Sequence, residues 1–293
     1  MSTSNPTTGK SKFARLLRLF LAGLASAYVC LILASSYLYT YKILHVPCLP
    51  GLQEHTGLQS ISLTTADGIP LRGWYRAPQN GTLVLLLGGL GATRDTMLPE
   101  AEMLMRHGFG VLLADTRSCA GALGSLGYFE VADLRAMADY AAAQPGVEKL
   151  GALGFSAGGV TVLLGAAEMP QIRGVVAMGN YPNLLQEITY SPAPTLSPEW
   201  ELQQLVDLSY GLLTVITPAQ VSPIDAIPKI SPRAVLILHG ELEAPRTQPE
   251  RQYQAAGEPR SLWIVPGAGH GGYLQAQPQE FERRVVAFFS ALP

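Results

Sequence analysis

The sequence predicts an α/β fold, in which helices cover both faces of a mostly parallel, eight-stranded sheet. Six short runs are continuously apolar, a pattern typical of strands that are buried on both faces of a parallel sheet. Helix-like segments separate most of these runs, and strands that alternate with helices indicate a doubly wound arrangement. The six runs lie at residues 82–88, 110–115, 149–155, 173–179, 234–240 and 261–267.

A hairpin opens the predicted domain and supplies the other two strands. Residues 60–65 and 70–77 each alternate between polar and apolar side chains, and the turn 66–68 (ADG) separates them. Such alternation on both sides of an Asp-Gly turn indicates an antiparallel pair. The predicted helices occupy residues 94–107, 129–144, 157–169, 247–256 and 273–291.

An apolar segment near the N-terminus predicts a membrane anchor. Residues 19–41 carry no charge, and a helix of that length crosses roughly 30 Å of hydrocarbon. Basic residues precede the segment and hold that end in the cytoplasm, so the rest of the chain is expected on the other side of the membrane. These residues are Lys10, Lys12, Arg15 and Arg18.

Two other interpretations of this segment stay open. A cleaved signal peptide has a shorter apolar core, of roughly 7–15 residues, but residues 34–36 (ASS) could still form a cleavage site. A buried helix of the domain would show a polar face, which the segment lacks. We therefore predict a cytoplasmic tail over residues 1–18, an uncleaved signal anchor over 19–41, a linker over 42–59 and the α/β domain over 60–293.

A long insertion interrupts the alternation of strands and helices. Residues 181–232 contain many prolines and no clear strand. Ser197 as an N-cap, followed by Pro198 and acidic residues, predicts the start of a helix. Long insertions in compact domains are often lids, so we expect a helical lid with an apolar inner face; a surface excursion without a role is the alternative. The aromatic residues of this lid are Tyr190, Trp200 and Tyr210.

The composition excludes several classes of function. Acidic residues all follow residue 53 and outnumber the basic residues there, so no nucleic-acid partner is expected. The sequence has no C-x-x-C motif and no histidine cluster of the metal-binding type, so neither a metal nor another cofactor is expected. Cys30 lies in the apolar segment. Cys48 and Cys119 could form one disulfide outside the cytoplasm, but two cysteines are not a disulfide framework, and we expect Cys119 to be a packed small residue.

A single serine lies within the pattern G-x-S-x-G. The stretch 148–167, EKLGALGFSAGGVTVLLGAA, places Ser156 between a predicted strand and a predicted helix, with Gly154 and Gly158 two residues to either side. A turn this tight has no room for side chains at the flanking positions, and it lifts the serine hydroxyl above the sheet. The next helix then begins at Ala157, whose backbone N–H could bind a developing oxyanion.

Together with four other segments, this motif resembles the α/β-hydrolase family, and the motifs occur in the family's order. Segment 85–97 is similar to the loop after the third strand, 112–125 to the loop after the fourth, 222–243 to the approach to the acid strand, and 265–289 to the histidine loop and final helix. The pattern is closest to the bacterial dienelactone-hydrolase-like and Bem46-like groups. The resemblance covers residues 60–291 and implies the α/β-hydrolase fold, with the helical lid between the sixth and seventh strands.

One histidine is placed to act as the base that a serine nucleophile requires. His270 lies in the sequence GAGHGG after the last predicted strand, on a loop without another polar side chain, and it matches the histidine loop of the family. His45 and His55 precede the domain, and His107 ends a helix. His239 ends a predicted strand, where we expect a structural role.

The resemblance also implies where the third catalytic group lies, because the family's order is Ser, acid, His. The family usually has Asp at the third position past Gly240, where this chain has Glu243. Glu241 is the nearest competitor, and Asp225 lies before the strand. Some relatives place the acid after the sixth strand, but that position holds Asn180. We predict Glu243, and failure of every carboxylate would leave a Ser–His dyad.

The loops after the third and fourth predicted strands match the family with departures. The resemblance implies the backbone N–H of Leu90 as the second oxyanion donor, although Gly88 replaces a histidine that generally supports this loop. The loop lacks the G-K-[ST] of a phosphate loop. In the next loop Asp115 and Arg117 match, whereas Ser118 and Ala120 do not. We expect Asp115 to orient its loop through Arg117, with a surface ion pair as the alternative.

These observations predict a membrane-anchored serine hydrolase that cleaves an ester or thioester with a modest acyl group. Ser156 is the predicted nucleophile, His270 the base and Glu243 the acid, and the N–H groups of Ala157 and Leu90 form the predicted oxyanion hole. The predicted partners are a small acyl substrate and the lipid bilayer. Two alternatives stay open: a membrane-proximal acyltransferase, and a non-catalytic binding module with the same fold.

Overall fold

The computed structural model describes residues 7–48, 51, 54–190, 193–244 and 248–293, with side chains from Lys12 onward. The first residues of the expected cytoplasmic tail and the side chain of Lys10 lie outside the described residues. Parts of the expected linker and lid lie outside them as well.

A mostly parallel, eight-stranded sheet forms the centre of the domain, as predicted, in the order β1-β2-β4-β3-β5-β6-β7-β8. β2 is antiparallel to β1 and to β4, so the predicted hairpin is confirmed, and the other neighbours are parallel. The strands are β1 (Gln59–Thr64), β2 (Pro70–Arg76), β3 (Thr82–Leu87), β4 (Gly110–Ala114), β5 (Lys149–Phe155), β6 (Ile172–Met178), β7 (Ala234–Gly240) and β8 (Arg260–Val265).

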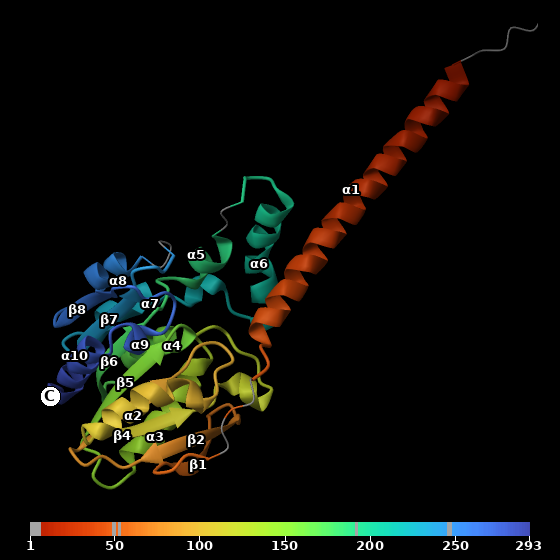
Figure 1. The fold of residues 1–293 in the computed structure, drawn as a ribbon. Coiled ribbons are helices and arrows are strands. Elements are labelled where there is room, and N and C mark those ends of the chain that lie inside the picture. The colour runs from red at the N-terminus through yellow and green to blue at the C-terminus, as the bar shows by residue number, and fades with distance from the viewer. Residues whose placement is uncertain (1–6, 49–50, 52–53, 191–192, 245–247) are drawn as a thin grey trace, which may run out of the picture.

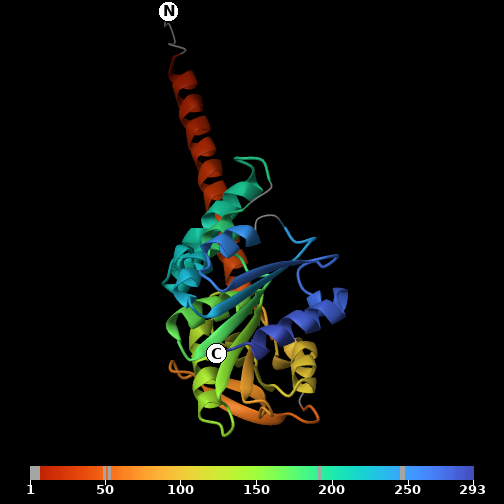
Figure 2. The ribbon, with the colours of Figure 1, turned by 90° about the vertical axis from the view of Figure 1, so that its left-hand side faces the viewer.

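Helices cover both faces of this sheet (Figures 1 and 2). Every residue of β3 is buried, and its side chains alternate between two cores. Leu83 and Leu85 belong to the core under α3 and α4, and Val84 and Leu86 to the core under α2 and α10. A strand that is buried on both faces therefore has a continuously apolar sequence, which is why these strands could be predicted. The helices are α2 (Leu98–Arg106), α3 (Glu130–Ala142), α4 (Ala157–Glu168), α8 (Pro249–Ala255), α9 (Tyr273–Ala276) and α10 (Pro278–Ser290).

The register of the central strands brings their carboxyl ends to one edge of the sheet. Leu87 of β3 pairs with Gly154 of β5, and Phe155 of β5 pairs with Met178 of β6. The loops that follow β3, β5, β6, β7 and β8 therefore meet at this edge. In open α/β sheets, ligands bind at this edge.

The first element, α1 (Thr7–Leu44), is one long helix that projects from the domain, as Figures 1 and 2 show. It is long and apolar enough to cross a membrane over Lys12–Leu44. Every side chain from residue 12 to residue 31 is exposed. The described part of the protein therefore leaves the N-terminal half of α1 uncovered.

The C-terminal half of α1 packs against the lid helix α6 (Pro198–Thr214) (Figure 1). Ile32, Ser36, Thr40 and Leu44 are buried, and their spacing of four residues places them on one face of α1. The segment expected as a free anchor, residues 19–41, thus contacts the lid over its C-terminal part.

Two polar contacts define how α1 and α6 lie together. The Tyr28 hydroxyl donates a 2.5 Å hydrogen bond to the carboxylate of Glu201, and the hydroxyls of Ser36 and Ser209 lie 3.2 Å apart. Both pairs follow the same direction along the two helices, so the helices are parallel. The N-terminal end of α6 therefore points away from the domain, along α1.

The lid expected at residues 181–232 is helical in its described part. The predicted helix start is confirmed, because the Ser197 hydroxyl accepts a 3.2 Å hydrogen bond from the backbone N–H of Trp200. Tyr210 is buried in the apolar core of the lid, whereas Tyr190 is 48% exposed, so the apolar inner face includes only part of the expected aromatic set. Besides α6, the lid contains α5 (Leu184–Thr189) and α7 (Pro223–Ala226).

Candidate active site

Ser156 lies on a sharp turn between β5 and α4. Its φ is 56°, a left-handed conformation that is strained for a residue with a side chain. The turn is held from both sides: the Ser156 N–H donates to the Met178 carbonyl at 2.8 Å, and its carbonyl accepts from Val160 at 3.1 Å. The strain is typical of a serine that is pushed out above a sheet.

The two flanking glycines are required because the backbone packs tightly against the turn. A Cβ atom at Gly154 would lie 2.2 Å from the carbonyl oxygen of Gly158. A Cβ atom at Gly158 would lie 2.4 Å from the carbonyl oxygens of Leu87 and Gly88. Real Cβ atoms do not approach backbone this closely, so a side chain at either position would displace the turn or the loop after β3.

His270 follows β8 and lies within hydrogen-bonding distance of the serine. Its Nε2 is 3.1 Å from Ser156 Oγ. The ring packs against Phe155 with centroids 4.9 Å apart. A Cβ atom at Gly179 would approach the imidazole to 3.1 Å, so that glycine leaves space for it. The His270 side chain is 51% exposed, so the imidazole reaches both the serine and solvent.

Glu243 lies on the other side of the imidazole. Its Oε2 is 3.1 Å from His270 Nδ1, and its Oε1 accepts a 2.7 Å hydrogen bond from the Gly240 N–H. The Glu243 side chain is only 3% exposed. A carboxylate on Nδ1 favours the tautomer in which Nδ1 carries the proton, and Nε2 is then free to accept the proton of the Ser156 hydroxyl.

Glu243 is held in its ionised form by its surroundings. Burial raises the pKa of this carboxyl, but contacts from His239, His270, the Gly240 N–H and Tyr273 outweigh burial and hold the pKa well below its usual value. His239, which we expected to be structural, is 1% exposed, and its Nδ1 lies 3.5 Å from Glu243 Oε2. A carboxylate that is ionised at neutral pH can stabilise an imidazolium on His270.

Tyr273 is a residue of this site that the sequence reasoning missed. Its hydroxyl donates a 2.5 Å hydrogen bond to Glu243 Oε1. Burial and the Glu243 carboxylate raise the pKa of Tyr273, so the hydroxyl keeps its proton and remains a donor. Its position three residues after His270, at the start of α9, is the signal that could have indicated it.

The other candidate positions bind partners other than His270. Glu241 accepts a 2.9 Å hydrogen bond from the Gly267 N–H on the surface. Asp225 accepts a hydrogen bond from Ser222 in the lid. Asn180 is fully buried and donates to the side chain of Gln252.

Ala157 and Leu90, the predicted oxyanion donors, line the same pocket as Ser156 and His270. Gly89 lies directly against Ser156, because a Cβ atom there would be 3.1 Å from Ser156 Cβ. Ala157 is the first residue of α4, so its N–H belongs to the positive end of that helix. Leu90 and the N-terminus of α4 therefore lie at the pocket that Ser156 and His270 line.

The pocket has a volume of about 260 Å³ and a largely apolar lining. Leu184 and Ile188 of the lid helix α5 form one wall, and Leu126 belongs to another. Among the residues that the structure describes, no group of three His, Cys, Asp or Glu side chains could hold a metal ion. The site thus brings Ser156, His270 and Glu243 together at a largely apolar cavity.

Comparison with known proteins decides the family. A family model described as "Alpha/beta hydrolase family" matches residues 84–284, which is more than half of the chain. The chain belongs to the alpha/beta hydrolase family. The matched range of this hydrolase includes Ser156, Glu243 and His270.

Two curated proteins match the hydrolase over a short stretch. "Uncharacterized protein PA2218" of Pseudomonas aeruginosa is 52% identical over 63 residues, which make up 22% of this chain and 17% of that protein. The polyketide transferase grgF of a Penicillium species is 35% identical over 66 residues, 22% of each chain. The hydrolase therefore aligns with a fifth or so of the length of these relatives.

Solved structures share the fold over most of the hydrolase. The Pyrococcus furiosus esterase Pf2001 has a TM-score of 0.66 at 20% identity, covering 84% of this chain and 99% of its own. PA2218 has a TM-score of 0.62 at 20% identity, with the same coverage of 84% and 99%. GrgF has a TM-score of 0.61 at 18% identity, covering 80% and 98%. At these identities the likeness shows the fold alone.

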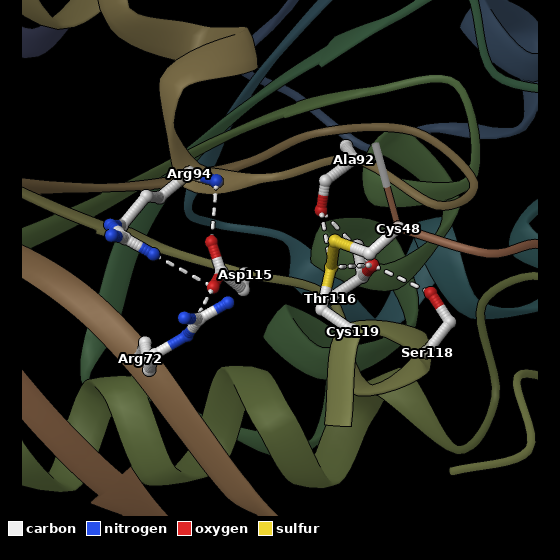
Figure 3. Close-up of a disulfide and its surroundings, with 8 residues drawn as sticks. All are labelled: Cys48, Arg72, Ala92, Arg94, Asp115, Thr116, Ser118 and Cys119. Carbon is white, nitrogen blue, oxygen red and sulfur yellow. Dashed lines mark hydrogen bonds and ion pairs between the residues drawn. A yellow bond between two sulfur atoms is a disulfide. The ribbon is translucent and has the colours of Figure 1, made fainter. Parts of the chain in front are cut away.

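In this hydrolase Asp115 binds the chain after β3 directly, and its hydrogen-bond partners do not include Arg117. It is 3% exposed and accepts hydrogen bonds of 2.8 Å from both the backbone N–H and the guanidinium of Arg94, and one from Arg72 (Figure 3). Arg117 instead binds Asp133 at 2.7 Å. The expected pairing of Asp115 with Arg117 is therefore wrong, and so is the alternative of a surface pair.

Cys48 and Cys119 form a disulfide, which corrects the expectation that Cys119 is only a packed small residue (Figure 3). The two cysteines are 71 residues apart, and no local motif connects them. The bond joins the segment that follows α1 to the loop after β4.

Proposed function

We propose that the protein is a serine hydrolase that cleaves carboxylic esters or thioesters. One observation carries the proposal: Ser156 Oγ, the His270 imidazole and the Glu243 carboxylate form a continuous chain with two contacts of 3.1 Å. The motif resemblance to dienelactone-hydrolase-like and Bem46-like groups supports the same chemistry, and so does the fold shared with the esterase Pf2001. Side chains and backbone carry every step below, so no cofactor is required.

In the first half-reaction Ser156 Oγ attacks the carbonyl carbon, and His270 Nε2 takes the hydroxyl proton. The carbonyl oxygen becomes an oxyanion, which the N–H groups of Ala157 and Leu90 stabilise. The imidazolium then gives its proton to the leaving oxygen or sulfur, and the alcohol or thiol departs. An acyl group remains on Ser156.

The second half-reaction uses the same groups with water as the nucleophile. His270 Nε2 takes a proton from water, and the hydroxide attacks the acyl carbon. The tetrahedral intermediate collapses, the proton returns to Ser156 Oγ, and the carboxylic acid is released. Throughout, Glu243 orients the imidazole and stabilises its charged form.

The pocket supports a substrate with a modest, apolar acyl group. Its volume of about 260 Å³ is below the range of roughly 300–1,000 Å³ that is typical of drug-sized ligands. Leu126, Leu184 and Ile188 offer contacts to a short acyl chain and no pairing for a charged one. Short-chain p-nitrophenyl esters and thioesters are therefore the substrates to test first.

Labelling with a fluorophosphonate probe tests the proposal. The full-length protein should react at Ser156, and Ser156→Ala should not. Ser290→Ala, which changes an exposed serine at the end of α10, is the matched control and should label like the wild type. A folded wild type that neither labels nor hydrolyses short esters would favour the non-catalytic binding module.

Acyl transfer is a second candidate, because the relative grgF is named a polyketide transferase. A transferase would pass the acyl group from Ser156 to an alcohol or amine, and water would be a slow competitor. Product analysis with and without added glycerol or a phospholipid distinguishes the two activities. Free acid as the main product in every mixture would exclude transfer.

We also propose that α1 stays attached as a membrane anchor. Every side chain over residues 12–31 is exposed, and α1 is long and apolar enough to cross a membrane over Lys12–Leu44, so this half of the helix is available to enter a bilayer. Lys12, Arg15 and Arg18 lie at the N-terminal end of that stretch, and their side chains would extend to the cytoplasmic headgroups. Cleavage after residue 36 would remove Ile32 and Ser36, which are buried against the lid.

The domain is proposed to lie outside the cytoplasm. The basic residues before the apolar stretch favour a cytoplasmic N-terminus, and a structural disulfide is typical of oxidising compartments outside the cytoplasm. A reporter enzyme that requires export, fused after Pro293, should therefore be active. Activity only of a cytoplasmic reporter at the same position would reverse the orientation.

A further inference from the structure

We propose that residues 44–48, here called the strap, position the loop after β3 for catalysis. This loop, residues 88–92 and here called the β3 loop, contains Leu90, so the proposal rests on the proposed function. The strap is the segment between the end of α1 and Cys48. Its role would be to hold the oxyanion donor in place beside Ser156.

The internal contacts of the β3 loop are not sufficient to fix its conformation. Gly88, Gly89 and Gly91 are three of its five residues, and glycine has the greatest backbone freedom of all residues. Within the loop the structure shows one backbone hydrogen bond, from the Ala92 N–H to the Gly89 carbonyl at 3.2 Å. An oxyanion donor acts best when it is fixed before the reaction, so contacts from outside the loop must supply the rigidity.

Val46 of the strap supplies the first of these contacts. Gly91 has a φ of 67°, and a Cβ atom on it would lie 2.5 Å from Val46 Cγ1. The Val46 side chain therefore occupies the space where a side chain at position 91 would be. It packs on the loop at the residue that directly follows Leu90.

The disulfide supplies the second contact, through the loop after β4. Cys48 is bonded to Cys119, and Thr116 of the same loop donates to the Ala92 carbonyl from its backbone N–H at 3.1 Å and from its hydroxyl at 3.0 Å (Figure 3). Ala92 is the last residue of the β3 loop. The strap thus touches the β3 loop through Val46 and holds its end through Cys119 and Thr116.

The N-terminal end of the strap, Leu44, is buried close to the proposed nucleophile. Leu44 is fully buried in one apolar cluster with Val160, which lies one turn after Ser156 in α4. The Leu44 carbonyl accepts a 3.2 Å hydrogen bond from the Gly124 N–H. The strap therefore crosses from the lid core to the disulfide and passes over the β3 loop between two fixed points.

Loss of the disulfide should reduce turnover more than substrate binding, because Leu90 acts mainly on the transition state. In full-length protein in detergent, we expect Cys48→Ser/Cys119→Ser to lower kcat by about tenfold and to leave KM within about twofold. The Ki of phenylboronic acid, whose serine adduct is tetrahedral and anionic, should rise by the same factor as kcat falls. Amide hydrogen exchange of residues 89–92 should become faster, a readout that requires no activity.

Chemical reduction should reproduce this effect. Dithiothreitol gives the bond two electrons and two protons, leaves Cys48 and Cys119 as thiols, and becomes a cyclic disulfide itself. The wild type should lose activity with the reductant, and the double variant should not respond. Cys30→Ala, which changes the remaining cysteine in α1, should match the wild type before and after reduction.

A second variant tests the strap with the disulfide intact. Val46→Ala removes the methyl groups that pack on Gly91 and should lower kcat several-fold, with faster exchange at residues 89–92. Val46→Thr keeps the branched shape, so its kcat and its hydrogen exchange at residues 89–92 should be close to those of the wild type. Because Val46 is only half-buried, neither substitution should unfold the protein. A difference in kcat between Val46→Ala and Val46→Thr would therefore report on the position of the loop and not on a general loss of folding.

The outcomes distinguish the strap from the proposed function. If kcat of the variants is unchanged in an active enzyme, with or without a change in hydrogen exchange, the proposed role of the strap is overturned. The hydrolase proposal then still stands. If the wild type neither reacts with the fluorophosphonate probe nor hydrolyses short esters, the proposed function is overturned, and the proposed role of the strap is overturned with it. A loss of kcat that follows exchange at residues 89–92 supports both.

Discussion

Tyr273 donates a 2.5 Å hydrogen bond to Glu243 Oε1, and this leaves Oε2 of the same carboxylate for His270 Nδ1. The two donors come from one short segment after β8. The carboxylate is thus held at one oxygen by the hydroxyl and the Gly240 N–H while it presents the other oxygen to the imidazole. Tyr273 is in this way a positioning residue for the proposed acid.

Tyr273→Phe should lower kcat by about tenfold and leave KM little changed, because a displaced acid tilts the imidazole without altering the pocket. The loss of a hydrogen bond to a charged group should also lower stability by about 1.5–3 kcal/mol. Steady-state kinetics on a short p-nitrophenyl ester and a thermal melt check the two effects. Tyr128→Phe, a change at an exposed tyrosine, is the control. Equal kcat in wild type and Tyr273→Phe would show that the hydroxyl does not position the acid.

Glu243→Gln and Glu241→Gln should separate the two neighbouring carboxylates. Glu243→Gln removes the charge that stabilises the imidazolium, and we expect kcat to fall by about 10³-fold or more. Glu241→Gln should stay within about twofold of the wild type, because Glu241 binds the Gly267 N–H at 2.9 Å on the surface. The ester assay with both purified variants checks this. A larger loss in Glu241→Gln than in Glu243→Gln would move the acid to position 241.

The low pKa of Glu243 predicts a dependence of stability on pH. Burial opposes ionisation, but the contacts of the carboxylate outweigh it, so the pKa in the folded protein lies below the ordinary value of about 4.3 in the unfolded chain. The stabilisation is fully present above that ordinary value. It is lost as the pH falls below it and through the pKa of the folded state, because the unfolded chain binds the proton first.

Thermal melts between pH 7 and pH 2 should therefore show a smaller fall in Tm for Glu243→Gln than for the wild type. Glu280→Gln is the control: hydrogen bonds from Arg283 and Arg284 lower the pKa of Glu280 to about 2, but this carboxylate is on the surface. Salt should screen its contribution and leave that of Glu243 largely intact. Identical acid profiles of the wild type and Glu243→Gln would contradict the assignment.

Features that depend on local sequence could be predicted, and features that depend on distant contacts could not. The turn at Ser156 was predictable because Gly154 and Gly158 lie within two residues of it. The buried strands were predictable because both faces are covered, which makes their sequences continuously apolar. His270 stands out because glycines surround it in a loop that has no other polar side chain, one strand after Glu243.

The disulfide and the partner of Asp115 could be identified only from the folded structure. Cys48 and Cys119 are 71 residues apart and meet only because the segment after α1 crosses the loop after β4. Asp115 binds Arg94, which precedes it in the chain, whereas the motif suggested Arg117. For Asp115 several basic partners were available, and packing selected among them. For the cysteines the sequence could name the pair, but only the fold shows that the two sulfur atoms meet.

The contact between α1 and α6 leads to a last prediction. Ser36 and Ser209 are both buried, with hydroxyls 3.2 Å apart, so Ser36→Cys/Ser209→Cys should form a disulfide readily in full-length protein. In a Cys30→Ala background, mild oxidation should protect both new thiols from a maleimide reagent. Leu33→Cys/Ser209→Cys is the matched control, because Leu33 lies on an exposed part of α1 and should stay reactive. Equal reactivity of the two pairs would mean that α1 does not pack on the lid, and it would remove the support that Ile32 and Ser36 give to an uncleaved anchor.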